Sequence, residues 1–266
     1  MPKRTSALAR AGTVSLARAL SKLGYCSRKE AARLVVAGRG CVHGARECSP
    51  QRRVSLATEH ISVDGVRVRE PQRRVVVALH KPTGYVTSRT DPAGRPTVYA
   101  LLADLGQWVF PVGRLDRDSS GLLILTDDHR LGHSLTDPDH HVPKTYHVRV
   151  SGIVANESLV ALREGISLPD GAVTRPARVE LFGTNRDGTS WIEITLREGR
   201  NRQVRRMCAA AGHDVVQLVR VRIAGLDLGD LPSGAWRRLQ PDEVARLASG
   251  RPRSPASPAR RRIRLG

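Results

Sequence analysis

Apolar residues near the beginning of the chain recur with helical spacing. Leu16, Leu20 and Leu23 fall at positions i, i+4 and i+7, which predicts a helix that ends at Gly24. The next segment, Ser27-Arg28-Lys29-Glu30, has the spacing of a capping box, with a serine followed three residues later by a glutamate. We therefore expect a pair of short helices, the second of which ends before residue 38.

Strand patterns dominate the rest of the chain. Apolar and polar residues alternate on both sides of Asp64-Gly65, which predicts a hairpin over residues 61–68. Apolar runs or alternation predict further strands at residues 75–79, 108–112, 122–125, 144–150, 191–197 and 215–223. Helices are expected at residues 128–135, 156–164 and 242–248, with one more that Asn201 caps. Many strands with scattered short helices indicate an α+β protein.

The order of these elements suggests a small domain before a large one. Residues 1–13 lack a pattern and are expected to be flexible, residues 14–70 form a compact module, and residues 71–74 form a linker. The large domain spans residues 75–248. Residues 249–266 are mostly Pro, Ser and Arg and cannot bury a core, so a disordered basic tail is expected.

Charge points to a polyanionic partner. The 266 residues include 44 Lys and Arg against 25 Asp and Glu, a net charge of +19, which favours nucleic acid binding. The cations of the predicted helix pair are candidate RNA contacts: Lys22, Arg28, Lys29, Arg33 and Arg39. A solvated basic surface without RNA readout is the alternative. No apolar run is long enough to span a membrane, so no membrane partner is expected.

Cysteines and histidines do not suggest a metal site. The four cysteines lack Cys-x-x-Cys spacing and no Cys/His set has the spacing of zinc ligands. The chain also lacks an apolar signal segment and a nucleotide-binding glycine motif. We therefore expect a cytoplasmic protein with reduced thiols that uses no cofactor and no metal.

One polar loop between two apolar runs is a candidate reactive site. It reads Gly113-Arg114-Leu115-Asp116-Arg117-Asp118-Ser119-Ser120-Gly121. Short buried strands on either side of a polar loop can hold a reactive group rigidly. Asp116 has cationic neighbours, so it stays ionised and is a candidate nucleophile or base. A surface turn with a salt bridge is the alternative for the loop taken alone.

This loop and the strand after it closely resemble the catalytic motif of the RNA pseudouridine synthases, in the version of the RsuA/RluB family that modifies ribosomal RNA. The matching phrase is Gly-Arg-Leu-Asp-x-x-Ser-x-Gly-Leu-Leu-Ile-Leu-Thr. The resemblance implies that Asp116 is the catalytic residue. The chain departs from the family at Ser119, where Thr is usual, and at Asp127-Asp128-His129, where Asn-Asp-Gly is usual.

Three further phrases match the family and assign roles to named residues. Lys144-Thr145-Tyr146 implies that Tyr146 packs against the target uracil and removes its C5 proton, although a core aromatic is the alternative. The segment from Glu198 to Met207 implies that Arg205 pairs with Asp116. Leu-Val-Arg at residues 218–220 implies that Leu218 lines the uracil pocket, with plain core leucine as the alternative. The remaining candidate substrate contacts are Arg114, Arg200, Arg202 and Arg206.

The resemblance also extends to the beginning and the fold of the chain. Residues 15–70 resemble the alpha-L domain, an S-four-like RNA-binding module, through Ser27-Arg28-Lys29-Glu30-Ala31, Gly38-Arg39-Gly40 and Val63-Asp64-Gly65. Lys-Pro-Thr-Gly at residues 81–84 matches a further family motif. The implied architecture is the pseudouridine synthase fold, with a mixed, mainly antiparallel central sheet after a small α+β RNA-binding domain.

The implied activity is isomerisation of a uridine in ribosomal RNA, 16S or 23S, or in an assembling ribosomal subunit. The N1–C1′ bond breaks and a C5–C1′ bond forms on a base that has left the helix. A monomer is expected. The alternative from another class is a non-catalytic RNA-binding protein of ribosome assembly. Asp116, Tyr146 and Arg205 separate the two, because pure binding does not need that trio.

Overall fold

The computed structural model describes residues 12–69 and 74–250. The flexible start, most of the linker and the basic tail expected from the sequence lie outside these residues. Contacts divide the chain into two compact units. One contains the residues up to Val75 with the segments Gly106–Phe110 and Thr126–His129, and the other contains the rest. No helix among the described residues has the length and apolarity needed to cross a membrane.

The N-terminal module, residues 12–69, packs two helices against short strands. Helices α2 (Leu16–Lys22) and α3 (Arg28–Val36) form the predicted pair. The Ser27 hydroxyl accepts a hydrogen bond from Glu30 N at 3.2 Å, which confirms the predicted cap. Strands β1 (Thr13–Ser15) and β4 (Arg53–Ser55) pair with each other. Strand β1 begins at Thr13, one residue before the range predicted for the module.

A four-stranded sheet completes this module. Its order is β3 (Ala45–Glu47), β2 (Gly40–Val42), β5 (Ile61–Val63) and β6 (Val66–Arg67). The turn between β5 and β6 confirms the predicted hairpin, because Asp64 and Gly65 both have positive φ, at 51° and 78°. The core consists mainly of aliphatic residues, including Leu16, Leu20, Leu34 and Val63.

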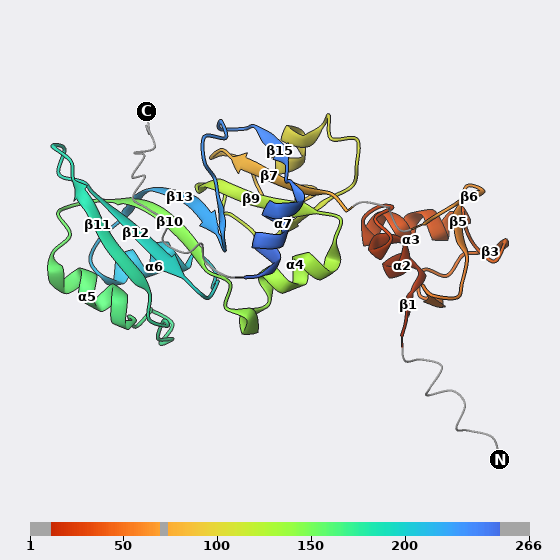
Figure 1. The fold of residues 1–266 in the computed structure, drawn as a ribbon, viewed down its shortest axis with the longest axis horizontal. Coiled ribbons are helices and arrows are strands. Elements are labelled where there is room, and N and C mark those ends of the chain that lie inside the picture. The colour runs from red at the N-terminus through yellow and green to blue at the C-terminus, as the bar shows by residue number, and fades with distance from the viewer. Residues whose placement is uncertain (1–11, 70–73, 251–266) are drawn as a thin grey trace, which may run out of the picture. The chain divides into compact units, whose positions relative to one another are not determined.

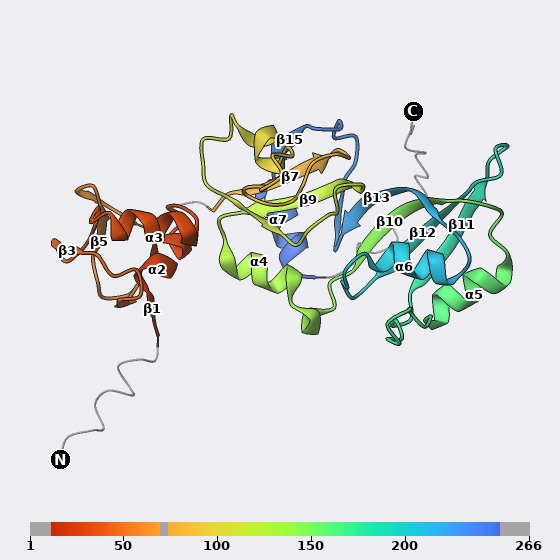
Figure 2. The ribbon, with the colours of Figure 1, turned by 180° about the vertical axis from the view of Figure 1, so that it is seen from behind.

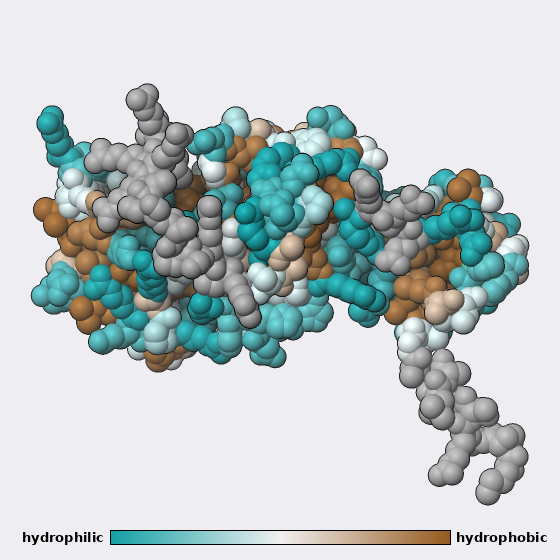
Figure 3. Space-filling view, in the orientation of Figure 1, coloured by the Kyte–Doolittle hydropathy of each residue, from teal (hydrophilic) through white to brown (hydrophobic). Residues whose placement is uncertain are grey.

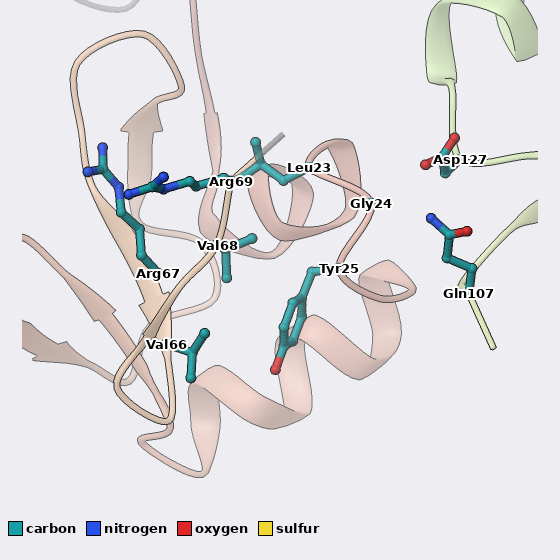
Figure 4. A pocket seen from close by; sticks show the side chains of 9 residues that line it. All are labelled: Leu23, Gly24, Tyr25, Val66, Arg67, Val68, Arg69, Gln107 and Asp127. Carbon is teal, nitrogen blue, oxygen red and sulfur yellow. The ribbon is translucent and has the colours of Figure 1, made fainter. Parts of the chain in front are cut away.

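The module also leaves apolar side chains at its surface. Figure 3 shows a mostly hydrophilic face with hydrophobic residues exposed between the polar ones. Tyr25 and Val66 are both exposed, and they line one shallow pocket together with Leu23 and Val68. Figure 4 shows Arg67 and Arg69 beside this pocket, so its apolar side chains have cationic neighbours.

The second unit is built on a nine-stranded sheet (Figure 1). The strand order is β11 (Arg178–Thr184), β12 (Ser190–Leu196), β10 (Lys144–Val150), β13 (Val215–Ile223), β9 (Ser120–Thr126), β7 (Val76–Lys81) and β15 (Trp236–Arg238). Strand β8 (Phe110–Val112) pairs with β9, and β14 (Leu226–Asp227) pairs with β13. The β13–β9 pair is parallel and the other registered pairs are antiparallel, which confirms the predicted mixed sheet.

Two helices cover one face of the sheet. Figure 2 shows α6 (Gln203–Ala210) in front of the central strands, with α5 (Asn156–Glu164) beside them. Met207 of α6 and Leu162 of α5 are buried in one cluster with Val148 and Ile192 of the sheet. The sheet therefore has a rigid, solvent-excluded face from which side chains of α6 extend toward the loop before β9.

The other helices follow the predictions closely, while several short strands were not predicted. Helix α4 covers His129–Thr136 and α7 covers Pro241–Ala248.

The prediction that Asn201 caps α6 is wrong. Arg202 is the cap residue, with a positive φ of 48° and no capping side-chain bond. Its side chain contacts Asp116 and Asp118 in the loop before β9.

Candidate active site

Hydrogen bonds from residues outside the loop hold the backbone of residues 113–119, which connect β8 and β9. Thr87 Oγ1 donates to Leu115 O at 2.8 Å and accepts from Leu115 N at 3.3 Å. Gly84 N, in the predicted Lys-Pro-x-Gly turn, donates to Arg117 O at 2.7 Å. These bonds lie one residue on each side of Asp116. The carboxylate is therefore carried by a fixed backbone, as a reactive group requires.

The buried side chain of Lys81 donates hydrogen bonds that hold the same loop. Its side chain is fully buried, and Nζ donates to Pro82 O at 2.9 Å and to Ser119 O at 2.7 Å. Burial lowers the pKa of Lys81 to about 8, although the negative charges of Asp116 and Asp118 oppose that shift. The sequence motif contained this lysine, but its role beneath the loop was not predicted.

The lowered pKa makes the stability of the fold depend on pH. The folded protein binds the Lys81 proton less tightly than the unfolded chain, so this residue adds stability as pH rises from about 8 to the ordinary value of 10.5. The gain is at most about 3 kcal/mol. Urea unfolding across this range should show a steeper rise for the wild type than for Lys81→Met. Lys29→Met, at an exposed position, is the control and should keep the wild-type slope.

Arg202, which caps α6, and Arg205 of α6 face the loop, but not in the predicted pairing. Arg202 Nη1 lies 3.7 Å from Asp116 Oδ2, while Arg205 Nη2 lies 3.3 Å from Asp118 Oδ2 and donates to Asp118 O at 2.8 Å. Arg205 Nη1 also donates to Val215 O at 3.2 Å, which holds the guanidinium beside Asp118. In this structure the expected Arg205–Asp116 pair is replaced by Arg205–Asp118, and Arg202 is the arginine beside Asp116.

Asp118 therefore forms a bridge between the loop and α6. Arg202 also contacts it, with Nη2 3.1 Å from Asp118 Oδ2. Burial tends to raise the pKa of Asp118, but the hydrogen bond from Arg202 and the charge of Arg205 lower it below its ordinary value. Sequence reasoning missed this residue, because two acids in one loop gave no means of choosing the partner of each arginine.

We predict that Arg205→Ala lowers turnover by about 10- to 100-fold while the protein stays folded. The reason is that the substitution removes the bond to the Asp118 backbone and leaves the loop less well positioned. Single-turnover rates on RNA and thermal unfolding provide the measurement. Arg246→Ala on α7, whose arginine pairs with Asp242, is the control. Unchanged turnover of Arg205→Ala would contradict this role.

The sheet brings Tyr146 and Leu218 near the same loop. Strand β13 lies between β9 and β10, with Arg220 opposite Gly121 on one side and opposite Tyr146 on the other. Two strand spacings separate β9 from β10, about 10 Å. Tyr146 is half-buried against the core, and Leu218, two residues before Arg220, is 6% exposed. Leu218 thus lies on the strand next to β9, which follows the Asp116 loop, and Tyr146 lies on the strand beyond it.

Two more cations lie among these strands, one buried and one half-buried, and sequence reasoning gave neither a role. Arg220 is 4% exposed, and its Nε donates to Leu122 O at 2.7 Å. Lys144 shares its strand and face with Tyr146, two residues away. Burial, with the charge of Arg220 as a second cause, lowers the pKa of Lys144 to about 8.

The other predicted substrate residues lie at or near the surface. Arg114 is exposed in the loop. Arg200 lies 3.3 Å from Glu198, and Arg206 lies 2.6 Å from Asp170. RNA phosphates that bind these two arginines must therefore compete with acidic side chains of the protein. No group of three or more His, Cys, Asp or Glu suited to a metal ion occurs in the described part of the chain.

Comparisons with known proteins show which family the chain resembles. A family model described as RNA pseudouridylate synthase matches residues 75–210. The chain is 38% identical to ribosomal large subunit pseudouridine synthase B of Bacillus subtilis, over 87% of this chain and 94% of that protein. The protein of that name in Yersinia pestis is 36% identical, over 84% of this chain and 72% of its own length.

A solved structure gives the same result. The crystal structure of a pseudouridylate synthase superimposes with a TM-score of 0.62 at 30% identity, covering 88% of this chain and 99% of that one. The family match includes the Asp116 loop, Tyr146 and the whole of α6. The similar proteins and the fold support the RsuA/RluB-type resemblance, and the chain belongs to the RNA pseudouridylate synthase family of isomerases.

Proposed function

We propose that this enzyme converts a specific uridine of ribosomal RNA to pseudouridine, with Asp116 as the nucleophile. The observation that carries the proposal is the support of Asp116. Its loop is bonded on both sides, Lys81 lies beneath it, and Arg202 is 3.7 Å from the carboxylate. The side chain remains 30% exposed, so an incoming nucleotide has access to it. The names of the Bacillus and Yersinia relatives support ribosomal RNA as the substrate.

The reaction is a rearrangement in which atoms balance without any co-substrate. The N1–C1′ bond breaks, a C5–C1′ bond forms, the C5 proton leaves, and N1 gains a proton. The Asp116 carboxylate attacks either C1′ of the ribose or C6 of the base and is released when the new bond has formed. A paired base hides these atoms, so the uridine has to leave the RNA helix first.

Tyr146 is our candidate for the residue that packs on the base and accepts the C5 proton. Its ring is half-buried in a strand, which gives the uracil a rigid partner. A neutral phenol is a weak base, so proton transfer needs a basic group nearby. Lys144 lies on the same strand face, and its pKa of about 8 leaves a larger fraction of its amine unprotonated near neutral pH than in an ordinary lysine.

The N-terminal module supplies RNA affinity in this proposal. Arg28, Lys29 and Arg33 are exposed along α3, although Arg33 lies 3.6 Å from Glu30. Arg39 is bound to Asp64 by two bonds of 2.9 and 2.5 Å, so it is less available to a phosphate than its sequence position suggests. Exposed arginines and lysines on one helix suit contacts to the RNA backbone.

Deleting the module before Pro71 should weaken RNA binding by at least about 10-fold, because several phosphate contacts are lost. The rate on bound RNA should change less, since the proposed catalytic residues all follow residue 75. Filter binding and single-turnover kinetics at saturating protein separate the two effects. Unchanged affinity would contradict the role of the module.

Release of tritium tests the proposed reaction directly. Ribosomal RNA labelled at C5 of uridine, from cells without the gene, is incubated with the purified protein. The proposal predicts release of one tritium per RNA molecule, together with one pseudouridine in the digested RNA. Release from neither 16S nor 23S RNA, free or in subunits, would contradict the proposed substrate.

A further inference from the structure

Arg220 is a buried cation without a buried acid. Its side chain crosses beneath β9, where Nε donates to Leu122 O at 2.7 Å and Nη1 lies 3.4 Å from Arg114 O. Within the described residues, no carboxylate forms an ion pair with it. Its Nη2 is enclosed and has no hydrogen-bond partner in the same part of the chain. A buried charge left in this state destabilises a fold, which suggests that function retains it.

The position of Arg220 relates it to both candidate reactive groups. It stands directly opposite Tyr146 in the β10–β13 register, so the two side chains project from the same face of the sheet. Nη1 approaches the backbone of Arg114, two residues before Asp116. Its charge contributes to lowering the pKa of Lys81 and of Lys144, after burial as the main cause. Positive charge therefore accumulates between the Asp116 loop and Tyr146.

We infer that Arg220 stabilises the negative charge that the uracil base carries during the rearrangement. This inference rests on the proposed function. When N1–C1′ breaks, the bonding electron pair stays on the base, which becomes an anion until C5 bonds to C1′. Attack of Asp116 on C6 instead moves an electron pair onto O4. Both routes place negative charge on the base, and a fixed cation in a water-poor site stabilises it.

The base is a better candidate than a phosphate for this charge. Arg220 is 4% exposed, whereas Arg114, Arg200 and Arg202 are exposed, so a phosphate of the RNA backbone reaches those three more readily than it reaches Arg220. A flat base stacked on Tyr146 comes close to the guanidinium across the sheet. The charge acts over this distance because the surrounding protein screens it less than water does.

The test compares Arg220→Gln with Arg220→Lys. Glutamine removes the charge but keeps a donor for Leu122 O, and lysine keeps the charge. Arg163→Gln on α5 is the matched control. Like Arg220, Arg163 donates a hydrogen bond from Nε to the carbonyl oxygen of a strand residue, here Val179 O at 2.8 Å. Single-turnover breakage of the N1–C1′ bond is followed by mass spectrometry on RNA made with uridine or with 5-fluorouridine. Fluorine withdraws electrons, so it stabilises the base anion without help from the protein.

On uridine RNA, Arg220→Gln should break the N1–C1′ bond about 100-fold more slowly than the wild type, as for loss of one stabilising donor in other enzymes. The same variant should show a defect at least about 10-fold smaller on 5-fluorouridine RNA. Arg220→Lys should stay within about 10-fold of the wild type, and Arg163→Gln should match it. The ratio of the two substrates within one preparation does not depend on how much of the variant has folded.

Three results would overturn the inference while leaving the proposed function intact. Equal defects on the two RNAs would make Arg220 a structural residue only. A loss of RNA affinity with a normal rate at saturation would make it a phosphate contact, and a wild-type rate would show that the charge has no role. Wild-type protein that breaks the bond in neither RNA would overturn the proposed function and this inference together.

Discussion

Asp116→Asn is expected to abolish pseudouridine formation, with a fall in turnover of at least about 10⁴-fold, as for loss of the nucleophile in other enzymes. An amide lacks the negative charge that attacks C1′ or C6. The fold should survive, because the side chain is 30% exposed and its ion pair with Arg202 is 3.7 Å long. Tritium release and thermal unfolding of the same preparation measure the two effects.

Asp230→Asn is the matched control for this substitution. Asp230 is also a loop aspartate of the second unit and is exposed, so its amide should keep both turnover and stability. If Asp116→Asn retained more than about a tenth of wild-type turnover, the carboxylate would not be the nucleophile, and Asp118 would be the next acid to test.

Gly121→Ala should destabilise the protein by more than about 4 kcal/mol, which is exceptional for one methyl group. Gly121 has a φ of +107°, and an added Cβ would lie 2.3 Å from Arg220 O and 2.5 Å from Arg220 N. Both atoms belong to the backbone of β13, so they cannot move aside without breaking the parallel β9–β13 pair. Urea unfolding should show early loss of the second unit.

Gly171→Ala is the control that measures the cost of a left-handed alanine without a steric clash. Gly171 also has a positive φ, +80°, but nothing lies within 4 Å of its added Cβ. Its cost should therefore be only about 1 to 2 kcal/mol, the price of a left-handed residue. Similar costs for the two substitutions would show that β9 and β13 do not approach as closely as described.

Local signals in the sequence predicted much of the fold. Helix α5 and strands β10 and β13 have the residue bounds that the apolar periodicity gave. Such elements follow from neighbouring residues alone, as does the Asp64-Gly65 turn. Short strands such as β1 and β15 were missed because three residues carry too little periodicity. The parallel β13–β9 pair depends on contacts about a hundred residues apart, which no local pattern encodes.

The sequence predicted which residues belong to the candidate site better than it predicted which residues contact each other there. Motif resemblance selected Asp116, Tyr146 and Arg205, and the structure brings their elements together. It did not reveal that Arg205 bonds to Asp118, because two acids in one loop gave no means of choosing the partner of each arginine. The roles of Lys81 and Arg220 depend on burial beneath the loop, and a charged residue in a sequence gives no sign of how deeply it will be buried.

The measurement that tests the central claim most directly is pseudouridine mapping of total ribosomal RNA. Cells carrying the wild-type gene, the Asp116→Asn gene or no gene are compared at single-nucleotide resolution. The proposal predicts that one pseudouridine disappears without the gene, returns with the wild type and stays absent with Asp116→Asn. Restoration by Asp116→Asn would contradict the nucleophile, and an unchanged map in all three strains would contradict ribosomal RNA as the substrate.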